Sequence, residues 1–263
     1  MTTPILKVTG LTMDFGGIRA LNKLDLDVHT GEIVALIGPN GAGKTTFFNC
    51  VTGIYVPTAG DVLLTPPGAG KSTSLKGLKP NHVTMKGLAR TFQNIRLFPK
   101  MTVLENVMIG RHCRTKAFII GAIFRGPATR KEEQEIMAMS FSLLEKIGLA
   151  DKANELAENL SYGEQRRLEI ARALATEPLL LLLDEPAAGM NPQETQELIN
   201  LIREISSDGQ AILLIEHDMK LVMTLSDRIF VMDYGKKIAE GRPEEIRTNP
   251  EVIKAYLGED VDA

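Results

Sequence analysis

Gly38-Pro39-Asn40-Gly41-Ala42-Gly43-Lys44-Thr45-Thr46 is the stretch that decides the fold, and it fits the pattern G-x-x-x-x-G-K-[ST] in full. Residues 32–37 before it form an apolar run of strand type, and residues 46–51 after it can begin a helix. A strand, a glycine loop and a helix start together bring backbone N–H groups onto a phosphate chain. Lys44 would then reach the β- and γ-phosphates, and the Thr45 hydroxyl would join the shell of a Mg²⁺ ion. An ordinary glycine turn is the alternative, but these flanks favour a nucleoside triphosphate site.

A second set of candidate residues follows two buried strands. Leucines fill positions 179–183, which is typical of a strand buried on both faces of a parallel sheet, and Asp184 and Glu185 come directly after them. Asp184 would hold Mg²⁺ through its water shell, and Glu185 would polarise the attacking water as general base. The apolar strand at 211–215 likewise precedes His217, which is then placed to contact a γ-phosphate. The alternatives are an exposed acidic turn and a structural histidine.

Three further positions carry weaker signals. Ser161 and Glu164 form a capping box that predicts a helix start, but the box does not explain Gly163, which permits close approach to a helix N-terminus, an anion site. Phe15 lies ahead of the phosphate loop, where its ring could stand beside a base; a core or edge phenylalanine is the alternative. Gln93 ends a strand-like segment, where a solvated polar residue is the ordinary interpretation.

Length and composition narrow the class of protein. The chain has 263 residues, of which 44% are hydrophobic and 24% charged, as in one large α/β domain. The net charge of −3 gives no support for a nucleic-acid partner. Cys50 and Cys113 lack metal-ligand spacing and favour a reduced, cytosolic chain. The first residues do not resemble a signal peptide, and the apolar runs are far shorter than the ~20 residues that cross a bilayer, so we expect any membrane role to come through partners.

Several other segments give local expectations. Residues 68–72 imitate half of a second phosphate loop, but position 65 is Thr65 where the pattern needs glycine, so a surface loop is expected. Thr102 and Glu105 form a capping box, and residues 132–149 have helical spacing. Residues 110–135 mix basic side chains with an eight-residue apolar stretch at 117–124. This segment is either a packed helix with a solvated basic flank or a docking surface.

Together, these motifs stand in the order and spacing of the nucleotide-binding domains of the ATP-binding cassette (ABC) family, which the chain resembles along nearly its whole length. The resemblance implies an α/β fold of the P-loop NTPase, ABC ATPase type, with a mixed central sheet, flanking helices and an antiparallel β subdomain. It implies one domain over residues 1–263, with a helical subdomain inserted at about 94–175. ATP and Mg²⁺ are the implied cofactors, and the implied activity is ATP hydrolysis coupled to transmembrane transport.

The resemblance also implies a role for each motif. Phe15 would stack on adenine, Gln93 would couple the metal site to a membrane partner, and Ser161 with Gly163 would close over the ATP of an opposing subunit. His217 would sense the γ-phosphate beside the base, Glu185. The implied nucleotide-binding residues are Phe15, Gly38, Pro39, Asn40, Gly41, Ala42, Gly43, Lys44, Thr45, Thr46, Gln93, Ser161, Gly163, Glu164 and Gln165, and the implied metal ligands are Thr45, Gln93 and Asp184.

Two departures from the common family pattern, Tyr162 and Asn191, point to a subfamily. With residues 215–219 and the ending Ala255-Tyr256-Leu257-Gly258, they resemble ATP-binding subunits of bacterial branched-chain amino-acid importers. In that subfamily two ATPases, generally different, sit under two membrane permease subunits at the cytoplasmic face of the membrane. An external binding protein delivers leucine, isoleucine or valine.

Other functions remain as alternatives. The ATPase of lipopolysaccharide export shares much of this pattern. A soluble cassette acting on nucleic acid or ribosomes usually has two cassettes or a long coiled coil, and this chain has neither. A clamp that binds nucleotide without hydrolysing it is disfavoured because Glu185 is present.

Overall fold

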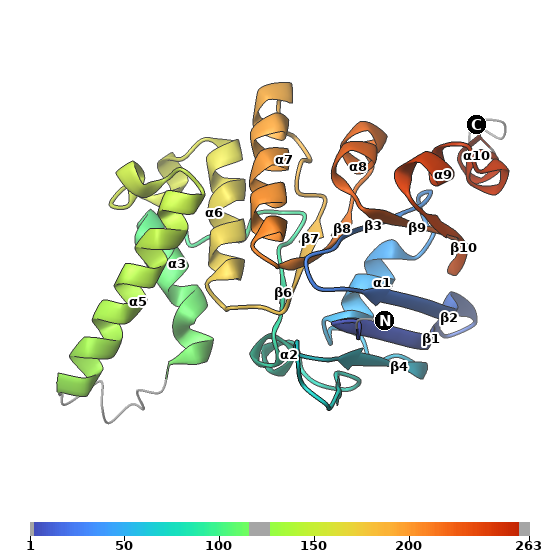
Figure 1. Ribbon diagram of the computed structural model, residues 1–263, viewed down its shortest axis with the longest axis horizontal. Helices are drawn as coiled ribbons and strands as arrows, with labels where there is room; N and C mark the ends of the chain where they lie inside the picture. Colours follow the sequence, from blue (N-terminus) through green and yellow to red (C-terminus); the bar gives the residue numbers. More distant parts are fainter. Residues whose placement is uncertain (1–2, 116–126, 258–263) are drawn as a thin grey trace.

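A six-stranded mixed sheet forms the centre of the computed structural model, which describes residues 3–115 and 127–257 (Figure 1). The strand order is β10-β9-β3-β8-β7-β6, with β10 antiparallel to β9 and the other neighbours parallel. The strands are β3 (Ile33–Ile37), β6 (Leu88–Arg90), β7 (Leu180–Asp184), β8 (Ala211–Ile215), β9 (Arg228–Asp233) and β10 (Lys236–Gly241).

The apolar runs of the sequence become strands buried on both faces. In β3, Ile33, Ala35 and Ile37 pack into one core, while Val34 and Leu36 pack into the other. A strand buried on both faces has no polar alternation, and each fully buried Leu or Ile contributes about 1.5–3 kcal/mol. One core lies under α7 (Pro192–Ser207) and α8 (Met219–Leu225), and the other surrounds α1 (Lys44–Val51).

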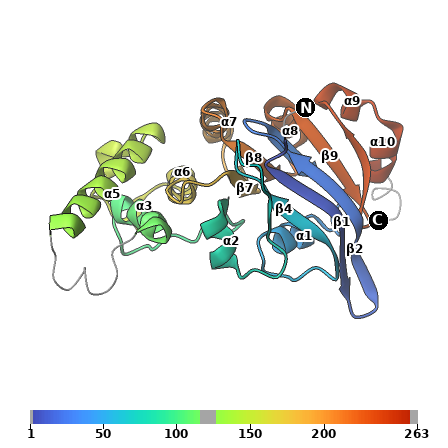
Figure 2. The same cartoon turned by 60° about the horizontal axis from the view of Figure 1, so that its bottom comes forward.

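An antiparallel sheet covers the far side of α1 (Figure 2). Its strand order is β2-β1-β4-β5, and β1 turns into β2 at Gly16 and Gly17. Phe47 and Phe48 of α1 are fully buried between the two sheets. The strands are β1 (Leu6–Phe15), β2 (Ile18–Val28), β4 (Ala59–Leu64) and β5 (Thr73–Ser74).

A group of helices stands to one side of the central sheet: α3 (Val103–Arg111), α5 (Pro127–Lys146) and α6 (Tyr162–Leu174) (Figures 1 and 2). Both predicted capping boxes are present, at Thr102 and at Ser161. The helix α5 begins before the predicted residue 132, because residues 127–131 continue the helix without adding to its apolar periodicity. The described parts contain no helix long and apolar enough to cross a membrane.

The remaining elements are short. Residues 66–72 form the loop that was expected in place of a second phosphate site. The helix α2, which follows it, was not predicted, because a proline opens it and glycines flank it. These elements are α2 (Pro80–Lys86), α9 (Pro243–Arg247), α10 (Pro250–Leu257) and the 3₁₀ helices η1 (His112–Arg114), η2 (Ala150–Lys152) and η3 (Ala157–Asn159).

Candidate functional site

Four neighbouring parallel strands end at the same edge of the central sheet. β3 leads into the phosphate loop, β8 precedes His217, β7 ends at Asp184 and β6 precedes Gln93. Open α/β sheets place their chemistry at this edge. The fold therefore brings together four of the motifs that the sequence separates by up to 179 positions (38 to 217).

The phosphate loop is shaped by its first glycine and by its lysine. Gly38 has φ +153°, and a Cβ there would lie 2.1 Å from the carbonyl oxygen of Met232, so only glycine fits. Lys44 is buried, and its Nζ donates to the carbonyls of Gly38 and Pro39 at 2.5 and 2.8 Å. The helix α1 starts at Lys44 without a side-chain cap, which leaves its first amides to a ligand.

Asp184 is paired with an arginine that sequence reasoning missed. Its Oδ2 accepts from Arg90 Nη2 at 2.6 Å, and the two side chains are only 9% and 8% exposed. Arg90 also donates to Asn49 Oδ1 of α1 at 2.8 Å, so it joins the phosphate-loop helix to the end of β7. Arg90 and Asp184 lie 94 positions apart, so the sequence contains no local signal of their pairing. The only available signal is that Arg90 is a charged residue at the end of a short apolar strand.

Glu185 is held on both carboxylate oxygens by two of the predicted residues. Gln93 Nε2 donates to Oε2 at 2.7 Å, and His217 Nε2 lies 3.0 Å from Oε1. The backbone of Glu185 is left-handed, with φ +48°, a conformation that costs about 1–3 kcal/mol in a non-glycine residue and that clusters at functional sites. The structure thus brings Gln93 and His217 together around the Glu185 carboxylate.

The loop after Glu185 is tied to β8 by Glu216, another residue that the sequence analysis did not single out. The Glu216 carboxylate is buried and accepts from the Ala187 amide at 2.9 Å and from the His217 amide at 3.1 Å. Burial raises the pKa of Glu216, and the backbone amides that donate to it act in the opposite direction. Glu216 fixes the position of the loop that carries the candidate base.

The start of α6 lies apart from the phosphate loop of the same chain. Figures 1 and 2 show α6 and α1 on opposite sides of β7. The close approach predicted at Gly163 is made by Glu194 of α7, because a Cβ on Gly163 would lie 2.8 Å from Glu194 Oε1. Ser161 is exposed, Glu164 completes the capping box, and Gln165 Nε2 donates to the Leu160 carbonyl.

Asn191, one of the two departures, caps the helix α7. Its Oδ1 accepts from the Gln193 and Glu194 amides at 2.9 and 3.0 Å, an N-cap that aspartate would form equally well.

Phe15, at the end of β1, is 42% exposed and contacts Tyr55 edge-on, with ring centroids 5.2 Å apart. Its ring is therefore accessible to a planar ligand.

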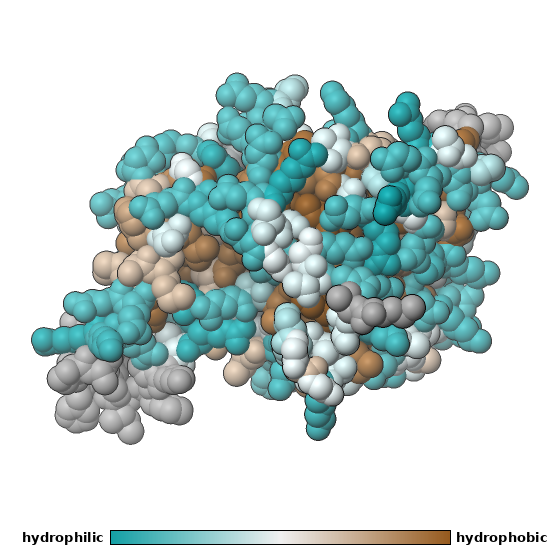
Figure 3. Space-filling view, in the orientation of Figure 1, coloured by the Kyte–Doolittle hydropathy of each residue, from teal (hydrophilic) through white to brown (hydrophobic). Residues whose placement is uncertain are grey.

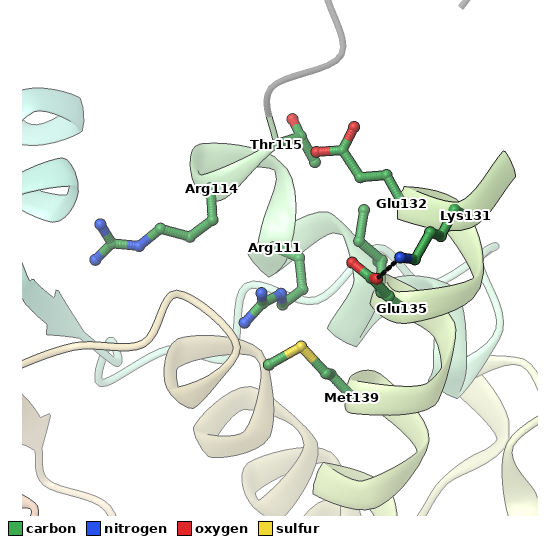
Figure 4. Close-up of a pocket in the computed structure, with 8 residues that line it drawn as sticks. Arg111, Arg114, Thr115, Lys131, Glu132, Glu135 and Met139 are labelled. Atoms are coloured by element: carbon green, nitrogen blue, oxygen red, sulfur yellow. Dashed lines mark ion pairs between the residues drawn. The ribbon is translucent and has the colours of Figure 1, made fainter. Parts of the chain in front are cut away.

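The basic end of α3 is engaged within the chain. Arg111 pairs with Glu177 at 2.6 Å, and Arg114 donates to the backbone carbonyls of Thr176, Glu177 and Met85. Figure 4 shows both guanidinium groups pointing away from Lys131 and Glu132 of α5. The apolar stretch at 117–124 lies outside the described residues. Charge reversal at Arg111 or Arg114 would therefore break contacts within the chain.

The donors at the sheet edge suit Mg²⁺ in chemistry. Thr45 is an exposed residue at the start of α1, and the Asp184 carboxylate and Gln93 amide supply further oxygen atoms. No cluster of three or more His, Cys, Asp or Glu side chains that could hold a metal occurs within residues 3–115 and 127–257. Mg²⁺ is usually bound by one or two protein oxygens together with substrate phosphates, so this sparse set fits it.

Comparison with known proteins agrees with this geometry. The ABC transporter family model matches residues 21–188. The chain belongs to the ABC transporter family. A model of the branched-chain amino acid ATP-binding cassette transporter matches residues 236–262, across β10, α9 and α10.

Relatives and solved structures cover nearly all of this ABC ATPase. It is 50% identical to the high-affinity branched-chain amino acid transport ATP-binding protein LivG of Escherichia coli K12 over 98% of this chain and 100% of LivG. It is 49% identical to BraF of Pseudomonas aeruginosa, with the same coverage. The crystal structure of an ABC transporter cassette in its ADP conformation superimposes with a TM-score of 0.83 at 32% identity, covering 98% of this chain and all of that one. The α/β fold of the ABC ATPase type is thus confirmed.

Proposed function

We propose that this chain is the ATP-binding and hydrolysing subunit of an importer for branched-chain amino acids. The observation that carries the proposal is the Glu185 carboxylate, gripped by Gln93 and His217 at the sheet edge where the phosphate loop also ends. A carboxylate fixed on both oxygens is oriented to accept a proton from water at the γ-phosphate.

Each side chain of the site has a place in that reaction. The loop amides and Lys44 bind the phosphates, and Phe15 stacks on the adenine through its exposed ring. Thr45, Gln93 and Asp184 would hold Mg²⁺, Asp184 through a water molecule, and the ion would supply positive charge next to the phosphates. His217 orients Glu185 through its Nε2 and would contact the γ-phosphate. Because Gln93 touches the base directly, its loop can report on the state of the site.

A groove beside the Gln93 loop is the proposed permease contact. Phe92, Phe98, Ile109 and Arg172 are among the residues that line it, between β6, α3 and α6. In Figure 3, apolar surface gathers over the side formed by α3, α5 and α6. In this proposal, residues 94–175 form a helical subdomain, and the apolar surface over α3, α5 and α6 belongs to it. Two permease subunits and a second ATPase, generally a different one in the subfamily's pattern, would complete an assembly at the cytoplasmic face of the membrane, served by an external binding protein.

The assignment of the transported substrate depends on the relatives of this chain. LivG and BraF are named for branched-chain amino-acid transport, and the model matching residues 236–262 has the same description. Both observations favour leucine, isoleucine and valine over lipopolysaccharide export. Nothing in the proposed site contacts the cargo, because its described motifs all serve the nucleotide.

Reconstitution tests the proposal. The chain would be coexpressed with its candidate permeases and second ATPase, and uptake of labelled leucine into proteoliposomes would be measured with the binding protein present. We expect ATP-dependent uptake that isoleucine and valine compete for and lysine does not. Glu185→Gln is the matched control, because it should assemble but not transport. Copurification without any leucine uptake by the native complex would overturn the cargo assignment.

A further inference from the structure

The guanidinium of Arg166 ties the start of α6 to the Gln93 loop. Arg166 is fully buried, and its Nη1 donates to the Phe92 carbonyl at 2.6 Å and to Glu169 Oε2 at 2.9 Å. Its Nη2 donates to the Gln93 carbonyl at 2.7 Å and to the Tyr162 hydroxyl at 3.0 Å. Four N–H donors therefore reach two backbone carbonyls and two side chains.

The two carbonyls belong to the segment that places Gln93. Residues 92 and 93 follow the end of β6 and lie outside the sheet. Gln93 therefore depends on contacts from α6 for its position, while its side chain lies 2.7 Å from Glu185. A shift of this backbone would move the Gln93 amide relative to the base.

The fourth contact of Arg166, with the Tyr162 hydroxyl, connects the guanidinium to the start of α6. Tyr162 is the first residue of α6, between Ser161 and Gly163, and its ring lies against Gly189, 3.4 Å from a Cβ built there. The ring is 42% exposed, but its hydroxyl accepts from Arg166. Tyr162, a departure from the common family pattern, is thus the acceptor that joins the helix start to the guanidinium.

Arginine chemistry suits this role. A planar guanidinium presents several donors in a fixed fork, whereas a lysine ammonium of the same charge cannot bridge the same set of acceptors. Glu169 balances the buried charge, and burial raises the pKa of its carboxyl while Arg166 lowers it. A second contact from α6, Arg172 to the Arg96 carbonyl, holds the loop farther along. Arg166 therefore governs the part of the loop that carries Gln93.

We propose that Arg166 is a positioning residue that makes Gln93 move together with the Tyr162 end of α6. This rests on the proposed function and on the role that the family resemblance implies for the Ser161–Gly163 helix start, which is to close over the nucleotide of an opposing ATPase. Closure of that start would pull the Gln93 amide into line with Glu185 through the Arg166 fork. Hydrolysis in one site would thereby depend on closure over the other.

The first test compares two conservative variants in the paired ATPases. Arg166→Lys keeps the charge but loses the fork, and Tyr162→Phe keeps the ring but removes the acceptor. We expect Arg166→Lys to lower kcat for ATP hydrolysis about tenfold, the worth of a charge-assisted hydrogen bond, with KM and ATP affinity within about twofold of native. Tyr162→Phe should lower kcat in the same direction by less. Arg203→Lys is the control for an arginine-to-lysine change outside the proposed link, because the exposed Arg203 of α7 donates to the Thr224 carbonyl.

A double-mutant cycle separates positioning from packing. If Arg166 acts through Gln93, Arg166→Lys should lower kcat less than about twofold in a Gln93→Ala background. Arg203→Lys should leave kcat unchanged in both backgrounds. Full additivity of the Arg166→Lys and Gln93→Ala losses would overturn the inference, as would native kcat in both Arg166→Lys and Tyr162→Phe.

Two further outcomes have defined meanings. If Arg166→Lys fails to fold, Tyr162→Phe in the same cycle decides between positioning and packing, because it removes only the hydroxyl that accepts from Arg166. If the native complex hydrolyses ATP but imports no leucine, the cargo proposal fails while the cycle still decides the role of Arg166. The two proposals are therefore tested separately.

Discussion

Two adjacent carboxylates at the end of β7 have opposite surroundings. Asp184 is buried against a guanidinium, whereas Glu185 is half-buried between an amide and an imidazole. The Arg90 guanidinium offsets the cost of burying the Asp184 carboxylate, whereas Glu185 is oriented by neutral hydrogen-bonding groups. These different environments support the proposed division of roles, with Asp184 holding the metal and Glu185 acting as the base.

The Arg90 pairing gives a prediction at the scale of the residue. Arg90→Met leaves Asp184 buried without its partner, so the free energy of unfolding in urea should fall by about 3–5 kcal/mol in the presence of EDTA. With Mg²⁺ and ATP the fall should be smaller, because the metal restores a positive charge near Asp184. The comparison is made after subtracting the stabilisation that the ligand gives the native protein.

The control for this prediction is Arg90→Lys, which keeps a charge within reach and should lose less stability in EDTA. Equal losses for Arg90→Met with and without Mg²⁺ and ATP would mean that Asp184 does not meet the metal.

At the scale of the element, the loop between β7 and α7 is fixed at both ends. Glu216 at the end of β8 accepts from the Ala187 amide, and Asn191 caps α7. The loop starts at the strained Glu185 backbone and passes Gly189, which lies against Tyr162. Its position is therefore set by β8, α6 and α7 together.

The raised pKa of Glu216 predicts a pH dependence of stability. A carboxyl whose pKa is higher in the folded than in the unfolded state favours folding below the unfolded value and loses that contribution as pH rises through the folded value. The stability of the native protein minus that of Glu216→Gln should therefore fall as pH rises above the ordinary glutamate value of 4.5. The fall should be about 1.4 kcal/mol for each tenfold by which folding strengthens proton binding at Glu216. Urea unfolding across this range measures it, and a flat difference would show that Glu216 titrates normally.

Sequence predicted the elements better than their contacts. The phosphate loop, the leucine strand before Asp184 and both capping boxes were readable because each is a pattern of neighbouring residues. Arg90 and Arg166 were not, since their partners lie 94 and 73 positions away and pairing depends on how strands and helices pack. The packing of Glu194 against Gly163 is likewise a long-range contact, because the sequence shows the glycine but not the side chain that packs against it.

At the scale of the whole molecule, the proposed nucleotide-binding groups are divided between two places. The phosphate loop and Glu185 lie at the sheet edge, and the Ser161–Gly163 helix start lies across β7 from α1. In the proposed assembly, each site uses the loop of one subunit and the helix start of the other. We expect ATP to hold the two faces together in this assembly, and loss of the γ-phosphate to let them separate.

This arrangement predicts opposite behaviour for two variants. Glu185→Gln keeps the size of the side chain and an oxygen to accept from Gln93, but it cannot take a proton, so ATP binding should survive while turnover falls about 10²–10⁴-fold. Lys44→Ala removes a charge that meets the phosphates and should fail at binding. We therefore expect an ATP-dependent dimer for Glu185→Gln and none for Lys44→Ala, measured by light scattering with each variant alone and mixed with the second ATPase.

The mixed sample decides how a weak dimer is interpreted. If Glu185→Gln associates only when the second ATPase is present, the natural pair is a heterodimer and the shared site stands. Near-native turnover by Glu185→Gln would remove Glu185 as the base. ATP binding by Glu185→Gln without association in either sample would contradict the shared site itself, because a closed pair held by unhydrolysed ATP is the state that this variant should accumulate.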